Sequence, residues 1–278
     1  MVDYLAVFWY IGSRCLGVEH FTLWEGVMNL DLDLELLDLT YKEMHLSALA
    51  ILMGTSLVDS IFVWGRAAGE WESSHPHSVL RYTAAIHHLT GAPIYIPGYY
   101  GRDVGQGETG YPGPETWADR LEHFGVQSGF IHKVEGGGHN TKTECEDFLK
   151  MADLLGLQCT AAVTTCIHAP RAMLGAVRSM DQMGLASLIM LPVWPGEVCL
   201  DREVYGSQGE GPFLLRDWIP REFGRIPTYT AQGDLATFPR LSEYLNGSGE
   251  KFDDLTSHAF PFESVIECLR PWTSASEA

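Results

Sequence analysis

The chain has 278 residues, which is long for one compact domain and short for two large ones. This length fits a single α/β domain with added segments. Eighteen basic residues against 36 acidic residues give a formal net charge of −18, so neither nucleic acid nor anionic lipid is an expected partner. Such a charge still allows a small cationic site built from a few arginines.

Hydrophobic periodicity predicts a helical segment first and then an alternation of strands and helices. Apolar residues recur at helical spacing through 1–56, although the Leu-Asp alternation at 30–34 also fits a strand. The expected strands are 58–64, 94–96, 130–134, 160–165 and 185–193, and the expected helices are 77–90, 115–124, 143–155 and 169–183. The glycine-rich segment 97–113 is expected to lack regular structure. This alternation predicts an open, mainly parallel, Rossmann-like sheet with helices on both faces.

The alternation of strands and helices stops after about residue 193. Turn sequences such as W-P-G-E and N-G-S-G-E then separate short predicted helices. We therefore divide the chain into an N-terminal helical segment (1–56), a Rossmann-like core (57–198) and a C-terminal extension (199–278). The extension is expected to pack on the core and is a candidate lid.

The sequence predicts no secretory signal peptide, because Asp3 is acidic and no basic segment precedes the apolar run 4–11. That run is too short to cross a bilayer, and the longer apolar segment 46–64 contains Asp59. The cysteines and histidines show no spacing typical of a zinc site, so no metal is expected. We therefore expect a cytoplasmic protein with reduced thiols.

Candidate ligand-binding residues follow the first two predicted strands of the sheet. Ligands of open α/β sheets bind at the carboxyl ends of the strands, where these residues are expected. They are Gly65, Arg66, Gly98, Tyr99, Tyr100 and Glu115. The turn at Gly65 lacks the spacing of a nucleotide-binding loop and equally suits a plain turn. Glu115 is explained first by the positive end of a helix dipole, and binding of a ligand hydroxyl or amine is the alternative.

The third junction reads E-G-G-G-H-N-T over 135–141 and leads into a helix. Asn140 or Thr141 can cap this helix, with Glu144 near its third position, so capping explains part of the pattern. Capping does not explain Glu135 beside three glycines. Glu135 is therefore a candidate catalytic residue, and Asn140 and Thr141 are candidate ligand-binding residues.

The fourth junction, V-T-T-C-I-H-A-P-R-A over 163–172, is the most informative. His168 suits acid–base catalysis because its reference pKa is near neutrality. Arg171 suits a phosphate or carboxylate at a helix N-terminus, with Thr165 beside it. The alternative is a loop-capping histidine and an arginine paired with a surface acid. Cys166 is either a nucleophilic thiolate or a small buried hydrophobe.

These junctions and the segments beside them carry a series of motifs along the chain. They are Asp59 with I-F-V-W-G at 61–65, Arg81 in the first helix, P-G-Y-Y-G at 97–101, Glu115, Glu135, N-T-K-T-E at 140–144, T-T-C-I-H-A-P-R-A at 164–172 and G-D-L at 233–235. Over about residues 58–195 the chain resembles the YdcF-like family, a domain of unknown function, and more its soluble branch than its membrane-anchored members. The motif at 164–172 is the most specific, because it resembles the family's Thr-Ser-x-x-His-x-x-Arg-Ala signature. The chain departs from the family in the P-G-Y-Y-G turn, where the family has Ser-Gly-Gly, and by one extra residue within N-T-K-T-E.

The resemblance implies a Rossmann-like domain that binds S-adenosylmethionine, with no implied reaction. The first hypothesis is therefore an enzyme that uses the sulfonium as a methyl or alkyl donor, with His168 and Glu135 as catalytic residues. Arg171 and Arg81 would hold a carboxylate or phosphate, and Glu135 or Glu115 would bind ribose hydroxyls or an amino group. A sulfonium is already activated, so the protein mainly has to orient it.

Two alternatives stay open, a non-catalytic module that binds such a ligand and an enzyme that acts on a phosphate ester. The ester would belong to a small phosphorylated molecule or a lipid phosphate, flanked by His168 and Arg171. It would need more cationic residues than these loops contain, whereas Trp64, Tyr99 and Tyr100 could offer aromatic faces to a sulfonium. S-adenosylmethionine is therefore the expected small-molecule ligand, and a homodimer stays open.

Overall fold

The computed structural model describes residues 58–67, 78–106, 108–165, 167–185, 187–194, 203–205, 211–245 and 247. The N-terminal helical segment predicted for 1–56 lies outside the described residues, as do Cys166 and residues 248–278. In the described part, no helix is long and apolar enough to cross a bilayer.

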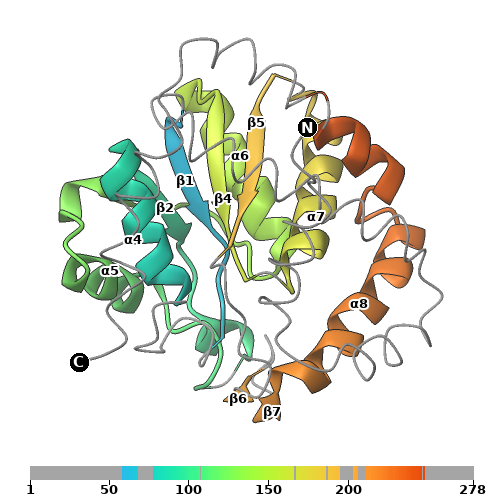
Figure 1. The fold of residues 1–278 in the computed structure, drawn as a ribbon, viewed down its shortest axis with the longest axis horizontal. Helices are drawn as coiled ribbons and strands as arrows, with labels where there is room; N and C mark the ends of the chain where they lie inside the picture. The colour runs from blue at the N-terminus through green and yellow to red at the C-terminus, as the bar shows by residue number, and fades with distance from the viewer. Residues whose placement is uncertain are drawn as a thin grey trace, which may run out of the picture.

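A sheet of five parallel strands forms the centre of the fold (Figure 1). The strands are β1 (Ser60–Val63), β2 (Ile94–Pro97), β3 (Ile131–Val134), β4 (Cys159–Val163) and β5 (Ile189–Val193). Their spatial order is β3-β2-β1-β4-β5, so the chain reverses its direction across the sheet between β1 and β4. This arrangement confirms the predicted open, parallel Rossmann-like sheet, and ligands of such sheets bind at the point of reversal.

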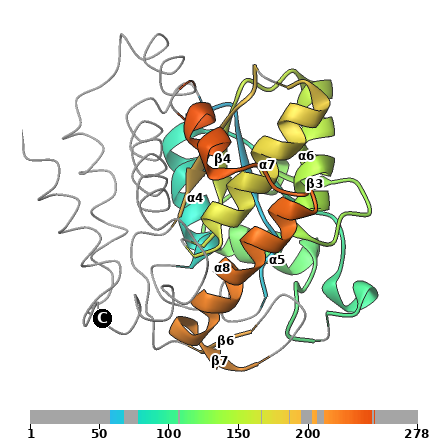
Figure 2. The same cartoon turned by 90° about the vertical axis from the view of Figure 1, so that its right-hand side faces the viewer.

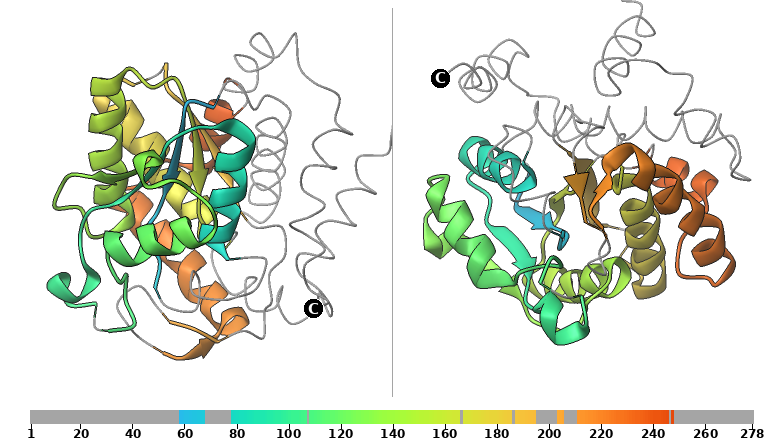
Figure 3. Two further views of the ribbon diagram at one scale, coloured as in Figure 1. Left: turned by 90° about the vertical axis from the view of Figure 1, so that its left-hand side faces the viewer. Right: turned by 90° about the horizontal axis from the view of Figure 1, so that it is seen from below.

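Successive strand residues point into two separate hydrophobic cores, because side chains alternate between the faces of a strand. Ile61 and Val63 pack in the core beneath α4 (Val79–Thr90) and α5 (Pro114–His123). Phe62 packs in the other core, beneath α6 (Thr141–Leu155) and α7 (Ala169–Met183). The view from below in Figure 3 separates these two layers, which confirms helices on both faces. Near-continuous apolar strands are what burial on both faces requires.

The described part of the C-terminal extension packs on the α6–α7 layer. A two-stranded antiparallel ribbon, β6 (Glu203–Val204) and β7 (Phe213–Leu214), leads into α8 (Leu215–Ala231), and a further helical stretch covers 238–245. Trp218, Ile219, Phe223 and Ile226 of α8 belong to the same core as α7. Figure 2 shows α8 lying across the outside of α7. The sequence predicted only short helices here, whereas α8 has 17 residues.

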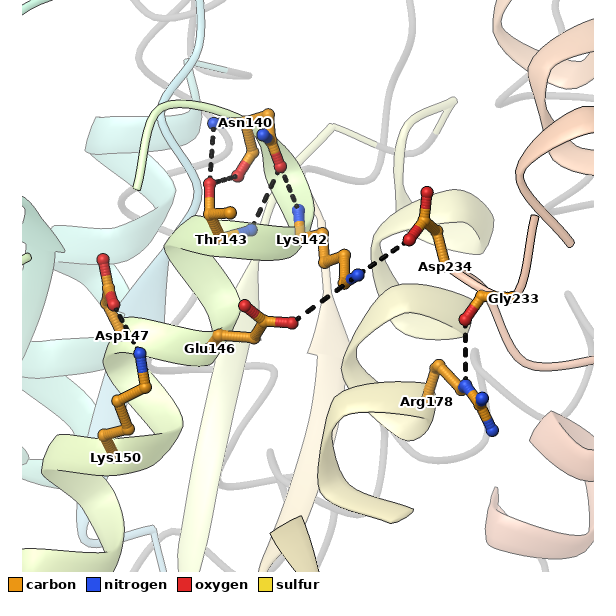
Figure 4. Close-up of polar contacts among 9 residues, drawn as sticks. All are labelled: Asn140, Lys142, Thr143, Glu146, Asp147, Lys150, Arg178, Gly233 and Asp234. Atoms are coloured by element: carbon orange, nitrogen blue, oxygen red, sulfur yellow. Dashed lines mark hydrogen bonds and ion pairs between the residues drawn. The ribbon is translucent and has the colours of Figure 1, made fainter. Parts of the chain in front are cut away.

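Helix α6 begins at Thr141, two residues before its predicted start, because its cap is Asn140. The Asn140 side chain accepts hydrogen bonds from the backbone of Lys142 and Thr143, each at 3.1 Å, and Thr143 completes a capping box (Figure 4). Glu144 takes no part in the cap, which corrects the arrangement expected from the sequence. Its carboxylate points into the protein instead.

The segment 97–113 contains one regular element, the 3₁₀-helix η2 (Gly101–Val104), although none was predicted. Gln106 organises the loop, because its side-chain oxygen accepts a hydrogen bond from the backbone of Tyr111 at 3.1 Å. The Tyr111 hydroxyl in turn donates to the carbonyl of Pro97 at 2.8 Å. These bonds hold the loop against the end of β2.

Candidate functional site

The carboxyl ends of β1 and β4 lie side by side at the point where the strand order reverses. Val63 pairs with Val163, and the backbone N–H of Trp64 donates to the carbonyl of Val163 at 3.3 Å. Gly65 and Arg66 follow β1, and the two threonines 164 and 165 follow β4. Helices α6 and α7 both begin at this edge, so their positive dipole ends lie there.

The imidazole of His168 is almost completely buried here, with 1% of its side chain exposed. Its Nδ1 lies 2.5 Å from Glu222 Oε1, and Arg171 Nε donates to the same oxygen at 2.7 Å. Its Nε2 lies 3.3 Å from Thr141 Oγ1. We call Thr141, His168, Arg171 and Glu222 the His168 cluster. It joins the first turns of α6 and α7 to the middle of α8.

The contact of Nδ1 with Glu222 at 2.5 Å, which is shorter than its 3.2 Å contact with Arg171 Nη2, assigns the tautomer of His168. A carboxylate only accepts hydrogen bonds, so Nδ1 carries the proton and donates it to Glu222. Nε2 then keeps its lone pair and accepts a hydrogen bond from the hydroxyl of Thr141. The arrangement presents a neutral imidazole whose basic nitrogen faces a hydroxyl group.

The charges around His168 keep it neutral and keep Glu222 ionised. Burial, together with the charges of Arg66 and Arg171, lowers the pKa of His168 to about 3, although Glu222 opposes this shift. Burial alone would raise the pKa of Glu222, but the charge of Arg171 and the two hydrogen bonds hold it well below its usual range. Glu222 therefore acts as a fixed anion that orients the ring.

A second buried carboxylate, Glu144, connects the first two junctions to α6. Its Oε2 accepts a hydrogen bond from the backbone N–H of Gly65, and its Oε1 accepts one from the Tyr99 hydroxyl, both at 2.8 Å. Burial raises the pKa of Glu144 to about 7, although these bonds and Arg66 lower it. Gly65 allows this approach, because a Cβ there would lie 2.9 Å from the Tyr99 hydroxyl.

The structure brings about half of the predicted site residues to one place. Gly65, Arg66, Thr141, Thr165, His168 and Arg171 lie around the ends of β1 and β4, and Tyr99 joins them through Glu144. Asn140 is explained by the cap of α6. Gly98 is explained by close packing, because a Cβ there would lie 2.5 Å from the carbonyl oxygen of Val134.

The other predicted residues lie away from the His168 cluster. Glu135 is exposed at the end of β3, which is separated from β4 by two strands, or ~14 Å. Glu115 and Tyr100 form a surface cluster with Lys133 of β3. Arg81 is half-buried in the first turn of α4. The structure therefore does not pair His168 with Glu135, and its carboxylate partner is Glu222.

Sequence reasoning missed Glu222 and assigned the other buried carboxylate, Glu144, to the cap of α6. Glu222 lies among Trp218, Ile219, Phe223 and Ile226 on the buried side of α8. An acidic residue at helical spacing within an apolar stripe is the signal that could have found it, because such a charge is buried only when it is paired. Glu144 was noticed, but capping was the explanation given to it.

The described residues contain no group of three or more histidine, cysteine or acidic side chains that could hold a metal ion. Comparisons of the chain with protein-family models, curated proteins and solved structures find no match. Fold and site therefore define a Rossmann-like α/β protein with a buried histidine–carboxylate pair at the reversal point. The YdcF-like resemblance stays a prediction based on its motifs.

Proposed function

We propose that this protein is an enzyme that hydrolyses or transfers a phosphate ester of a small molecule, with His168 as its proton-transfer residue. The observation that carries the proposal is the His168 cluster. Glu222 holds Nδ1, and Nε2 keeps its lone pair at the edge where ligands of this fold bind. A positioned base with an orienting carboxylate is the arrangement that general acid–base catalysis uses.

Several features of this edge favour an anionic substrate. The Arg66 side chain lies close enough for its charge to lower the pKa values of His168 and Glu144, although the chain as a whole carries −18. The N-termini of α6 and α7 add positive dipole ends, which bind phosphate readily. Arg66 supplies cationic charge beside His168 in addition to Arg171, which bonds to Glu222.

The hydroxyl of Thr164 is a further reason to expect a ligand at this edge. It follows β4 directly and is 1% exposed, and it has no hydrogen-bond partner among the described residues. A buried hydroxyl without a partner costs on the order of 1–3 kcal/mol. An oxygen of a bound substrate would satisfy it.

An anionic substrate would also make His168 a better base. The positive charge of Arg66 is one of the causes that lower the pKa of His168. A phosphate group beside Arg66 offsets that charge, so the pKa of the imidazole rises toward the working pH. His168 can then take a proton from the attacking hydroxyl and return one to the leaving oxygen.

S-adenosylmethionine, the ligand expected from the resemblance, is the competing candidate. Two of the aromatic rings expected to face its sulfonium are buried, and the third belongs to the surface cluster of Glu115. Trp64 is 1% exposed and Tyr99 is 8% exposed, while the Tyr100 hydroxyl bonds to Glu115. A phosphate ester therefore fits this site better than S-adenosylmethionine does.

The test compares wild-type protein with His168→Gln and with a matched control, His87→Gln. His87 is also buried, at 7% exposure, but it bonds to the carbonyl of Ala92 beyond the last turn of α4. With p-nitrophenyl phosphate and its diester we expect turnover that falls about 10²–10⁴-fold in His168→Gln only. Equal loss in both variants, or micromolar calorimetric binding of S-adenosylmethionine with no ester turnover, would overturn the proposal.

A further inference from the structure

Thr141 is held in place from two sides at the start of α6. Asn140 caps the helix immediately before it, and Trp64 Nε1 donates to its backbone carbonyl at 3.3 Å. Its hydroxyl lies 3.3 Å from His168 Nε2, and the residue is half-buried. The hydroxyl therefore has a fixed position beside the imidazole.

Capping of α6 does not require this hydroxyl. Thr143, two residues further on, completes the capping box through its own hydroxyl, which accepts the N–H of Asn140 at 3.3 Å. The two threonines share one helical turn but have different partners. The contact of Thr141 with His168 therefore does not help to cap α6.

We infer that the Thr141 hydroxyl is the nucleophile of the proposed reaction and that the phosphoryl group is carried on it as a phosphothreonine. The inference rests on the proposed function. A hydroxyl, a base within hydrogen-bond reach and a carboxylate that orients the base are the three parts of an activated nucleophile. Thr141, His168 and Glu222 supply them in that order, at 3.3 Å and 2.5 Å.

The two steps balance without any further reactant than water or an acceptor hydroxyl. First, Thr141 Oγ1 attacks phosphorus, its proton passes to His168 Nε2, and the bond from phosphorus to the leaving oxygen breaks. The leaving oxygen takes the proton from Nε2. Then water, or the acceptor hydroxyl, gives its proton to Nε2 and attacks phosphorus, and the bond to Thr141 Oγ1 breaks. Thr141 recovers its proton from His168.

The experiment uses the full chain with Thr141→Val, Thr141→Ser and a control, Thr228→Val. Thr228 is exposed in the last turn of α8. With p-nitrophenyl phosphate we expect a stoichiometric burst of nitrophenolate from the wild type. We also expect one phosphoryl group on residue 141 in acid-quenched protein analysed by mass spectrometry. Thr141→Val should lose the burst and the adduct, and its turnover should fall about 10²–10⁴-fold. Thr141→Ser, which keeps a hydroxyl, should still form the burst and the adduct. Thr228→Val should keep the burst, the adduct and the wild-type turnover.

The outcomes separate this inference from the proposed function. Turnover that depends on His168 but persists in Thr141→Val would overturn the inference, and water would then be the direct nucleophile. Absence of ester turnover in every protein, the wild type included, would overturn the proposed function and the inference with it. Thermal unfolding of Thr141→Val serves as the folding control, because valine is close to threonine in shape.

Discussion

Glu222 and Glu115 both accept hydrogen bonds from a cationic side chain and a ring-bearing one, but Glu222 is buried and Glu115 is exposed. Glu222 lies between the His168 ring and the Arg171 guanidinium and is 2% exposed. Glu115 accepts hydrogen bonds from the Tyr100 hydroxyl and the Lys133 ammonium, and 52% of its side chain is exposed. Both carboxyl groups have lowered pKa values.

The difference between them lies in what holds each charge. Hydrogen bonds from Lys133 and Tyr100 lower the pKa of Glu115 to about 2, but water and salt screen this surface cluster. Glu222 keeps its charge against the cost of burial because Arg171 and His168 face one of its oxygens and Arg225 lies 3.7 Å from the other. A lowered pKa alone therefore does not mark the candidate site, whereas a buried charge with fixed partners does.

The largest expected effect separates these two clusters by stability. Glu222→Ala leaves Arg171 buried without its anion, so we expect a loss of about 3–5 kcal/mol in the free energy of unfolding. Glu115→Ala removes an exposed pair and should cost about 0–1 kcal/mol. Urea denaturation of both variants at neutral pH measures the two values. Equal losses would remove the distinction between the clusters.

A pH series tests the neutral state of His168 that depends on this cluster. The pKa of His168 is about 3 in the folded protein, against 6.5 for an ordinary histidine. Between pH 6.5 and 3, His168 therefore binds a proton in the unfolded chain but not in the folded protein. The stability contribution is complete above pH 6.5 and is lost as the pH falls toward 3. We expect His168→Gln to remove this part of the acid sensitivity, by a few kcal/mol, in denaturation curves at pH 7 and pH 4.5.

Glu144 is a third kind of carboxylate in this protein, because it is buried and its pKa is raised. Burial raises this pKa to about 7, although hydrogen bonds from Gly65 and Tyr99 and the charges of nearby arginines lower it. Between pH 4.5 and 7 the folded state keeps a proton that the unfolded state has lost. Stability from this residue is therefore present below pH 4.5 and is lost as the pH rises through 7. Glu144→Gln should remove that slope, about 3 kcal/mol over the whole range. Denaturation at pH 4.5 and pH 8 checks the sign, and an unchanged slope would contradict the assignment.

Much of the fold was predictable because its signals are local. Buried apolar runs predicted β1, β2, β4 and β5, and the sheet-edge strand β3 was also predicted although its two middle residues are exposed. The periodic residues from Ala169 to Met183 predicted α7 at its observed bounds. Boundaries failed where a side chain decides them, as at Asn140, whose cap starts α6 before the predicted residue. Helix α8 was missed as a long element because two prolines within it, Pro220 and Pro227, resemble breaks in the sequence.

The candidate site was predictable only in the part that strand ends determine. Thr165, His168 and Arg171 follow β4 directly, so topology alone places them at the reversal point. Glu222 is 54 residues from His168 and reaches it through the packing of α8 on α7. No local pattern encodes that contact. Glu135 was preferred because it lies near glycines, but the position of β3 in the sheet separates it from β4.

The smallest expected effect concerns the link between Glu144 and the first junction. In Gly65→Ala the new Cβ would lie 2.9 Å from the Tyr99 hydroxyl and 3.4 Å from both oxygens of Glu144. Such crowding costs about 1–3 kcal/mol. Gly129→Ala is the control, because a Cβ there meets nothing within 4 Å.

Tyr99→Phe removes the hydroxyl that the new methyl group would meet, so the double variant with Gly65→Ala tests the cause of the loss. We expect the two substitutions together to cost less than the sum of their separate effects on unfolding. Additive losses would mean that the Tyr99 hydroxyl does not crowd position 65. The close approach of Glu144 would then be the reason for glycine at position 65. In that case the methyl group of Gly65→Ala should push the Glu144 carboxyl toward water and lower its pKa, so the stability slope should appear at a lower pH.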